Sequence, residues 1–254
     1  MASKKPRLGS PSGPANMSSP TSPNNVAETL VSFSSNAVLS AESICPLSTL
    51  ELLVDDFFTY IHPLCPFPHE PSFRNAFSAR QDLYAPSFLS LLASMVGVLV
   101  ASFPRKPRLH LKSQQSEHLF PNSLSLVERC HNIAMQARGA GYLDNPNLSV
   151  YDAITSYFLG LSGAYTFKWK QTRLYFGECL TILRVIGAHR VKNKQSFVPM
   201  DTLHSSHGGE NGFETQPEIV DYIKQEMGRR VFWVMFVGIR FVFQIPVVFH
   251  AEYI

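Results

Sequence analysis

The stretch SFLSLLASMVGVLVASF, residues 87–103, decides the fold class because it is long enough for a helix and carries no charge. A helix that is apolar on every side belongs in a protein core or in a membrane. Spanning a bilayer takes about 20 apolar residues, and this stretch is shorter. We therefore predict a core helix here.

A second apolar stretch keeps a membrane alternative open. VFWVMFVGIRFVFQIPVVF, residues 231–249, is long enough to span a bilayer. However, Arg240 and Pro246 lie inside it, and each is costly in a helix that faces lipid. We favour a protein without membrane contact, with a membrane-associated helical protein as an alternative.

The residues before the core stretch predict two more helices. Ser48 and Glu51 have capping-box spacing, and apolar residues recur at helical intervals as far as Ile61. The connector HPLCPFPHEP, residues 62–71, then ends the helix because each proline removes a backbone donor. A short helix is expected near Phe73 and Phe77.

The residues after the core stretch predict a series of helices separated by loops. Gly139 ends the first of these helices, and Ser149 with Asp152 begins the second. The expected helices cover about 123–138, a segment from 149, 167–188 and 217–243, and the expected loops are 104–118 and 191–216.

Two finer expectations concern the packing of the segments from 149 and 167–188, which we predict to form an antiparallel pair. Glycines inside helices indicate close approach of a neighbour, here at Gly160, Gly163 and Gly177. The expected buried positions of 167–188 are Leu174, Leu180, Leu183, Val185 and Ile186. With little alternation typical of strands, the sequence predicts an all-α fold, a multi-helix bundle with long loops.

The domain organisation follows from composition. Residues 1–43 are rich in Ser, Pro, Asn, Ala and Gly, which predicts a disordered leader, and residues 44–254 form the predicted helical domain. Lys4, Lys5 and Arg7 in the leader are a candidate nuclear-import cluster, with a solvated tail as the alternative.

The composition points away from several kinds of chemistry. A net charge of +3 gives no strong footprint for nucleic acid. The four cysteines, Cys45, Cys65, Cys130 and Cys179, are widely spaced, which predicts buried thiols rather than a zinc site. No metalloprotease, nucleophile-elbow or phosphate-loop motif occurs, so we predict no enzyme, no catalytic residue and no cofactor in this chain. An enzyme without a recognisable motif is the other alternative.

Two adjacent arginines are the sharpest local feature of the sequence. Arg229 and Arg230 directly precede the apolar residues Val231, Phe232 and Trp233. In the interpretation that we favour, one arginine pairs with Glu226 while Phe232 and Trp233 enter the core, and ligand binding is the alternative.

Three blocks of the sequence resemble the middle region of fungal zinc-cluster transcription factors. Residues 50–73 are similar to its opening, with His62, Pro63 and Pro66 in the connector and Pro71 and Phe73 in the turn. The segment 148–190 resembles the helical pair that follows and ends in Gly187, Ala188, His189 and Arg190. The third block consists of Glu226, Arg229, Arg230, Val231, Phe232 and Trp233. In order and spacing the resemblance covers about residues 48–240.

The resemblance implies a nuclear regulatory domain that controls transcription by RNA polymerase II. Family members usually carry an N-terminal zinc cluster of six cysteines, but no cysteine precedes Cys45 here. We therefore expect DNA to be a partner only through a missing zinc-cluster domain, and zinc only in that domain. Transcriptional co-regulators or a second copy are the other expected partners. The ending FQIPVVFHAEYI departs from the family pattern, which indicates a truncated C-terminus.

Overall fold

A computed structural model of the chain describes residues 39–113, 122–188 and 221–250. These residues form helices and connecting turns without a strand, which confirms the predicted all-α class. The helices are η1 (Ala41–Ser43), α2 (Leu47–Tyr60), α3 (Glu70–Ser78), η2 (Gln81–Leu83), α4 (Pro86–Ser102), α5 (Lys106–Ser113), α6 (Ser123–Arg138), η4 (Tyr142–Asp144), α7 (Val150–Tyr165), α8 (Trp169–Val185) and α9 (Tyr222–His250).

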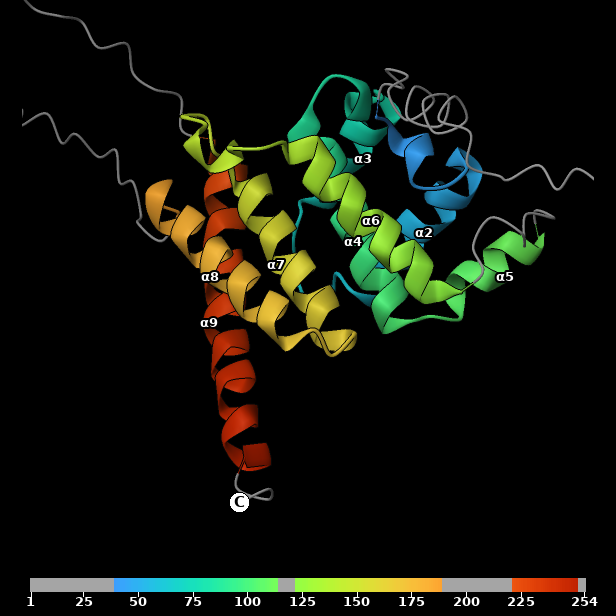
Figure 1. Ribbon diagram of the computed structural model, residues 1–254. Coiled ribbons are helices and arrows are strands. Elements are labelled where there is room, and N and C mark those ends of the chain that lie inside the picture. Colours follow the sequence, from blue (N-terminus) through green and yellow to red (C-terminus); the bar gives the residue numbers. More distant parts are fainter. Residues whose placement is uncertain (1–38, 114–121, 189–220, 251–254) are drawn as a thin grey trace, which may run out of the picture. The chain divides into compact units, whose positions relative to one another are not determined.

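Helix α4 is the centre of the core, as its sequence predicts. Pro86 occupies its first turn, and every residue from Phe88 to Val100 is buried. It contacts α2, α6 and α7, and Figure 1 shows it behind α6. Because neighbours cover it on several sides, an apolar surface all round is stable without a membrane. No described helix has the length and hydropathy that a membrane crossing requires.

Helices α7 and α8 form the predicted pair, joined by a short turn, and glycine allows them to approach closely. A Cβ atom at Gly160 would lie 2.5 Å from the Phe176 ring, and one at Gly163 would lie 2.8 Å from the Thr172 hydroxyl. The prediction of close approach is confirmed at these two positions. It is wrong at Gly177, where nothing lies within 4 Å of a built Cβ atom.

The predicted buried face of α8 is largely wrong. Leu183 is buried, but Leu174 is 73% exposed and Val185 is 69% exposed. Leu180 and Ile186 are half-buried. The helix instead buries Thr172, Phe176, Cys179, Ile182 and Leu183. This face is buried because two of its residues, Thr172 and Phe176, fit against the glycines of α7.

Ordered structure begins before the predicted start of the helical domain. The backbone N–H of Ala41 donates to Asp82 Oδ2 at 2.8 Å, and Arg80 pairs with both Asp82 and Glu42. These contacts hold η1, which lies inside the predicted leader, against the body of the protein. Helix α2 also begins earlier than predicted, after Pro46, so Ser48 is not its N-cap.

The remaining elements follow the sequence to different degrees. Helix α6 has the predicted bounds, and Asn122 caps it by accepting a hydrogen bond from the Ser125 N–H at 2.8 Å. The capping box of Ser149 and Asp152 is present at the start of α7. Helix α5 occupies residues predicted to be a loop, and His110 in it contacts Asp56 at 2.7 Å.

The bounds of α9 differ from the predicted 217–243. The helix continues through Pro246 to His250, beyond the predicted end at Phe243. The predicted N-terminal proline, Pro217, and the predicted loop 191–216 lie outside the described residues.

Candidate functional site

Segments from all three family-like blocks meet at one junction, which we call the motif junction. It consists of the connector 62–71, the C-terminal end of α8 at residues 187–188, and residues 226–233 of α9. Helix α9 contacts both α7 and α8 along this part of the bundle, and Figure 1 shows the three helices side by side.

The connector holds its shape through its histidines and its buried rings. His62 Nε2 lies 3.1 Å from the Pro68 carbonyl oxygen, and its ring packs on Phe58 at 5.2 Å between centroids. Burial lowers the pKa of His62, so at neutral pH the ring is uncharged and donates its N–H to that carbonyl. Phe73 is fully buried against the same Phe58 ring at 5.6 Å. The connector is therefore anchored to the core at both ends.

The end of α8 is a Schellman motif built on Gly187. Gly187 has φ of 66°, which a residue with a side chain rarely adopts. Its N–H donates to the Arg184 carbonyl at 3.1 Å, and the Ala188 N–H donates to the Leu183 carbonyl at 3.0 Å. The glycine thus stops the helix and turns Ala188 toward α9.

Gly228 of α9 packs against this turn. A Cβ atom at Gly228 would lie 2.7 Å from the Ala188 Cβ atom, so only a glycine leaves room for the contact. One residue earlier, the buried Met227 accepts a hydrogen bond at its Sδ from the His69 N–H at 3.2 Å. Two neighbouring residues of α9 thus bind the α8 end and the connector.

The two arginines lie on the exposed side of the junction. Arg229 and Arg230 both pair with Glu226, and the Arg230 contact is 3.0 Å. These hydrogen bonds lower the pKa of the Glu226 carboxyl group. Arg230 Nη1 also donates to the Pro66 carbonyl oxygen at 3.4 Å. The predicted pairing with Glu226 is confirmed, and it extends to both guanidinium groups.

The prediction for the two aromatic residues after the arginines is only partly correct. Phe232 is half-buried and packs against the core, but Trp233 is 62% exposed and does not enter it. Among the described side chains of α9, the buried ones are Met227, Val231 and Met235, spaced four residues apart, and Trp233 falls on another face. Trp233 instead contacts Phe236 with ring centroids 6.0 Å apart.

The other predicted residues have different surroundings. Pro63 is exposed, and Pro71 occupies the first turn of α3. His189, Arg190, Lys4, Lys5 and Arg7 lie outside the described residues.

Several residues that join the segments of the junction are not predicted from the sequence. His69 contacts Met227, and Gly228 lies against Ala188, which the sequence indicates only as part of a motif. A glycine in the middle of a predicted helix was the available signal for Gly228. No sequence pattern predicts the His69–Met227 contact, because it joins residues far apart in the chain.

The junction has packing and charge but no arrangement typical of catalysis. Across the described ranges 39–113, 122–188 and 221–250, no three His, Cys, Asp or Glu side chains form a group that could hold a metal ion. The four cysteines are free and buried, and burial raises the pKa of each thiol. The junction itself is a packed and charged contact between the connector, the turn after α8 and α9.

The fold and the junction define a helical domain whose last described helix is fastened to two other segments, the connector and the turn after α8. The model of the family described as "Fungal specific transcription factor domain" matches residues 54–238, which is most of the chain. The chain belongs to this family. No curated protein and no solved structure shows a detectable match to the chain.

Proposed function

We propose that this chain is the regulatory region of a fungal transcription factor that acts in the nucleus on transcription by RNA polymerase II. The observation that carries the proposal is that the family match, residues 54–238, contains the whole motif junction. The residues of the family-like blocks therefore coincide with the contacts that fasten α9 to the connector and to α8.

In this proposal the motif junction sets the regulatory state. Helix α9 is held to the body at three positions. Gly228 lies against Ala188, Met227 accepts a hydrogen bond from His69, and Arg230 donates one to Pro66. A contact made of few side chains is suited to change when a signal or partner binds. Transcriptional co-regulators, or a second copy of the chain, are the proposed partners.

We assign DNA recognition to a zinc cluster of the kind that the family carries, outside residues 39–250. The modest net charge of +3 supports this division, because tight binding to phosphate groups needs many basic contacts. Zinc is accordingly proposed only for that cluster.

The test is to fuse the full chain to an unrelated DNA-binding domain in a fungal cell that carries a matching reporter gene. We expect reporter transcription to differ from that with the DNA-binding domain alone, in either direction. The level and nuclear location of the fusion protein serve as controls. An unchanged reporter in the presence of folded, nuclear fusion protein would contradict the proposed function.

A further inference from the structure

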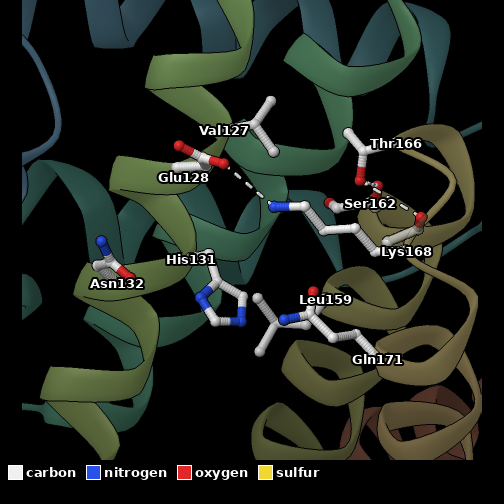
Figure 2. Close-up of a pocket in the computed structure, with 10 residues that line it drawn as sticks. Val127, Glu128, His131, Asn132, Leu159, Ser162, Thr166, Lys168 and Gln171 are labelled. Carbon is white, nitrogen blue, oxygen red and sulfur yellow. Dashed lines mark hydrogen bonds and ion pairs between the residues drawn. The ribbon is translucent and has the colours of Figure 1, made fainter.

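A pocket away from the motif junction has features of a ligand site. It lies between α6, α7 and the start of α8 and has a volume of about 250 Å³. This is slightly below the range of about 300–1,000 Å³ that is typical of sites for drug-sized ligands, so the pocket has room only for a small molecule. Figure 2 shows the side chains that line it, including Glu128 and His131 from α6 and Ser162 and Lys168 from the opposite wall.

Two opposite charges face each other across this pocket. Lys168 Nζ lies 3.2 Å from Glu128 Oε1, with side chains 40% and 54% exposed. Figure 2 shows that this ion pair joins the two walls. They are the charged side chains of the lining, since burial lowers the pKa of His131 and leaves that ring neutral at pH 7. An exposed pair of this kind is weak enough to open for a ligand.

Ser162 provides an independent sign that the pocket receives a polar group. Ser162 is one of the lining residues and is 7% exposed, and its buried hydroxyl has no hydrogen-bond partner in the described structure. A buried hydroxyl without a partner is unfavourable, so such groups are usually satisfied by a bound molecule or water. Figure 2 labels Ser162 among the residues that line the pocket.

We propose that the pocket binds a small α-amino acid as its zwitterion. The carboxylate of the ligand pairs with Lys168 and accepts a hydrogen bond from the Ser162 hydroxyl. Its ammonium group pairs with Glu128. A simple anion would pair with Lys168 but be repelled by Glu128. A simple cation would pair with Glu128 but be repelled by Lys168. A zwitterion replaces one ion pair by two, while Val127 and Leu159 offer an apolar surface to its side chain.

Such a ligand joins two separate parts of the bundle. Glu128 belongs to α6, whereas Lys168 caps the start of α8, the helix whose other end forms the motif junction. A regulatory role for the ligand rests on the proposed function, but binding of the ligand to the purified chain does not. Binding and transcription can therefore fail separately.

The experiment measures binding of individual proteinogenic L-α-amino acids to the purified full chain by calorimetry and thermal unfolding. N-acetyl amino acids, which lack the ammonium, and amino-acid amides, which lack the carboxylate, are the matched controls. We expect saturable binding of at least one amino acid and binding at least about tenfold weaker for both of its modified forms.

Variants assign the binding to this pocket. Lys168→Met, Glu128→Gln and Ser162→Ala are each expected to weaken binding, the first two by about tenfold or more. Lys170→Met and Glu51→Gln remove exposed charges outside the pocket and are expected to bind as the unaltered chain does. Circular dichroism of each variant shows that it is folded.

Three results would overturn the proposal. The first is the absence of binding by every amino acid at millimolar concentration, which would leave water as the occupant. The second is equal binding of the zwitterion and its amide, which would indicate a site for uncharged polar molecules. The third is binding that a folded Lys168→Met variant retains in full.

Discussion

Arg138 is a buried residue that makes several polar contacts inside the core. Its side chain is 1% exposed and pairs with Glu178 at 2.9 Å. It also donates to the Tyr142 hydroxyl, the Asp152 carbonyl and the Ser156 hydroxyl. A buried guanidinium is tolerated only when such partners surround it, and here Nε alone lacks one. Arg138 thereby links α6 to both α7 and α8.

We expect Arg138→Ala to lower the free energy of unfolding by about 3 kcal/mol, because it leaves Glu178 and several polar groups without their partner. Arg184→Ala removes an exposed arginine from α8 and should change stability by less than about 0.5 kcal/mol. Urea unfolding of both variants measures the difference. Equal stability of the two variants would show that the Arg138 network contributes nothing.

Burial of two histidines makes stability depend on pH. Burial lowers the pKa of both His62 and His131 from 6.5, so the unfolded chain binds more protons than the folded chain near and below this value. Their contribution to stability is therefore present above pH 6.5 and is lost as the pH falls.

We expect the free energy of unfolding of the His62→Gln, His131→Gln variant to fall less between pH 7.5 and about 5.5 than that of the unaltered chain. Urea unfolding at each pH provides the measurement. A variant with the same or a steeper decrease would show that these histidines are not the groups responsible.

At the scale of elements, the pair α7 and α8 depends on two glycines. Phe176 packs on the backbone of α7 at Gly160, and Thr172 does so at Gly163. The exposed Gly177 of α8 has free space around it and serves as a matched control.

Gly160→Ala should lower the free energy of unfolding by about 1–3 kcal/mol, because the new methyl group would overlap the Phe176 ring. Gly177→Ala should raise it by about 0.5–1 kcal/mol, because alanine favours a helix interior more than glycine does. Thermal or urea unfolding compares the two. If Gly160→Ala stabilises as much as Gly177→Ala, the close approach at Gly160 is wrong.

A helix could be predicted correctly when residues at its own ends determine where it starts and stops. Helix α6 has a polar cap and a terminal glycine at its ends, and its bounds were predicted correctly. Helix α5 was missed because Pro107 and several charges favour a loop, while its contacts to Asp56 on α2 lie far away in the sequence. The predicted buried face of α8 was wrong because Thr172 and Phe176, which fit against the glycines of α7, are buried in place of the exposed Leu174.

The candidate site was predicted in outline only. The resemblance indicated the three blocks, and the pairing of Glu226 with arginine follows from helical spacing. The closest contacts of the junction involve His69, Met227 and Ala188, which meet only after the chain has folded. The apolar run after the arginines also predicts Trp233 in the core, because a uniformly apolar stretch does not indicate which face is buried.

At the scale of the whole molecule, one core buries all four cysteines. Cys45, Cys65, Cys130 and Cys179 are free, and burial raises the pKa of each thiol, for Cys45 to about 12. A thiol reacts as its thiolate, so these groups are unreactive while the fold is intact.

We expect a thiol reagent such as DTNB to label none of the four cysteines in the native chain at pH 7.5 and all four in denaturant. The stoichiometry of released thionitrobenzoate provides the measurement. Rapid labelling of any of them without denaturant would show that the core opens at that position.

We propose that the motif junction fastens α9 to the body and thereby sets regulatory output. A reporter assay with the tethered chain compares Gly228→Val and Gly238→Val, two substitutions in the same helix. Gly228 lies against Ala188, whereas no described residue lies within 4 Å of a built Cβ atom at Gly238.

Circular dichroism shows that both proteins are folded, and their levels are matched. We expect Gly228→Val to change reporter output by severalfold and Gly238→Val to leave it near that of the unaltered chain. Reporter output that is the same for both variants would contradict a regulatory role of the motif junction.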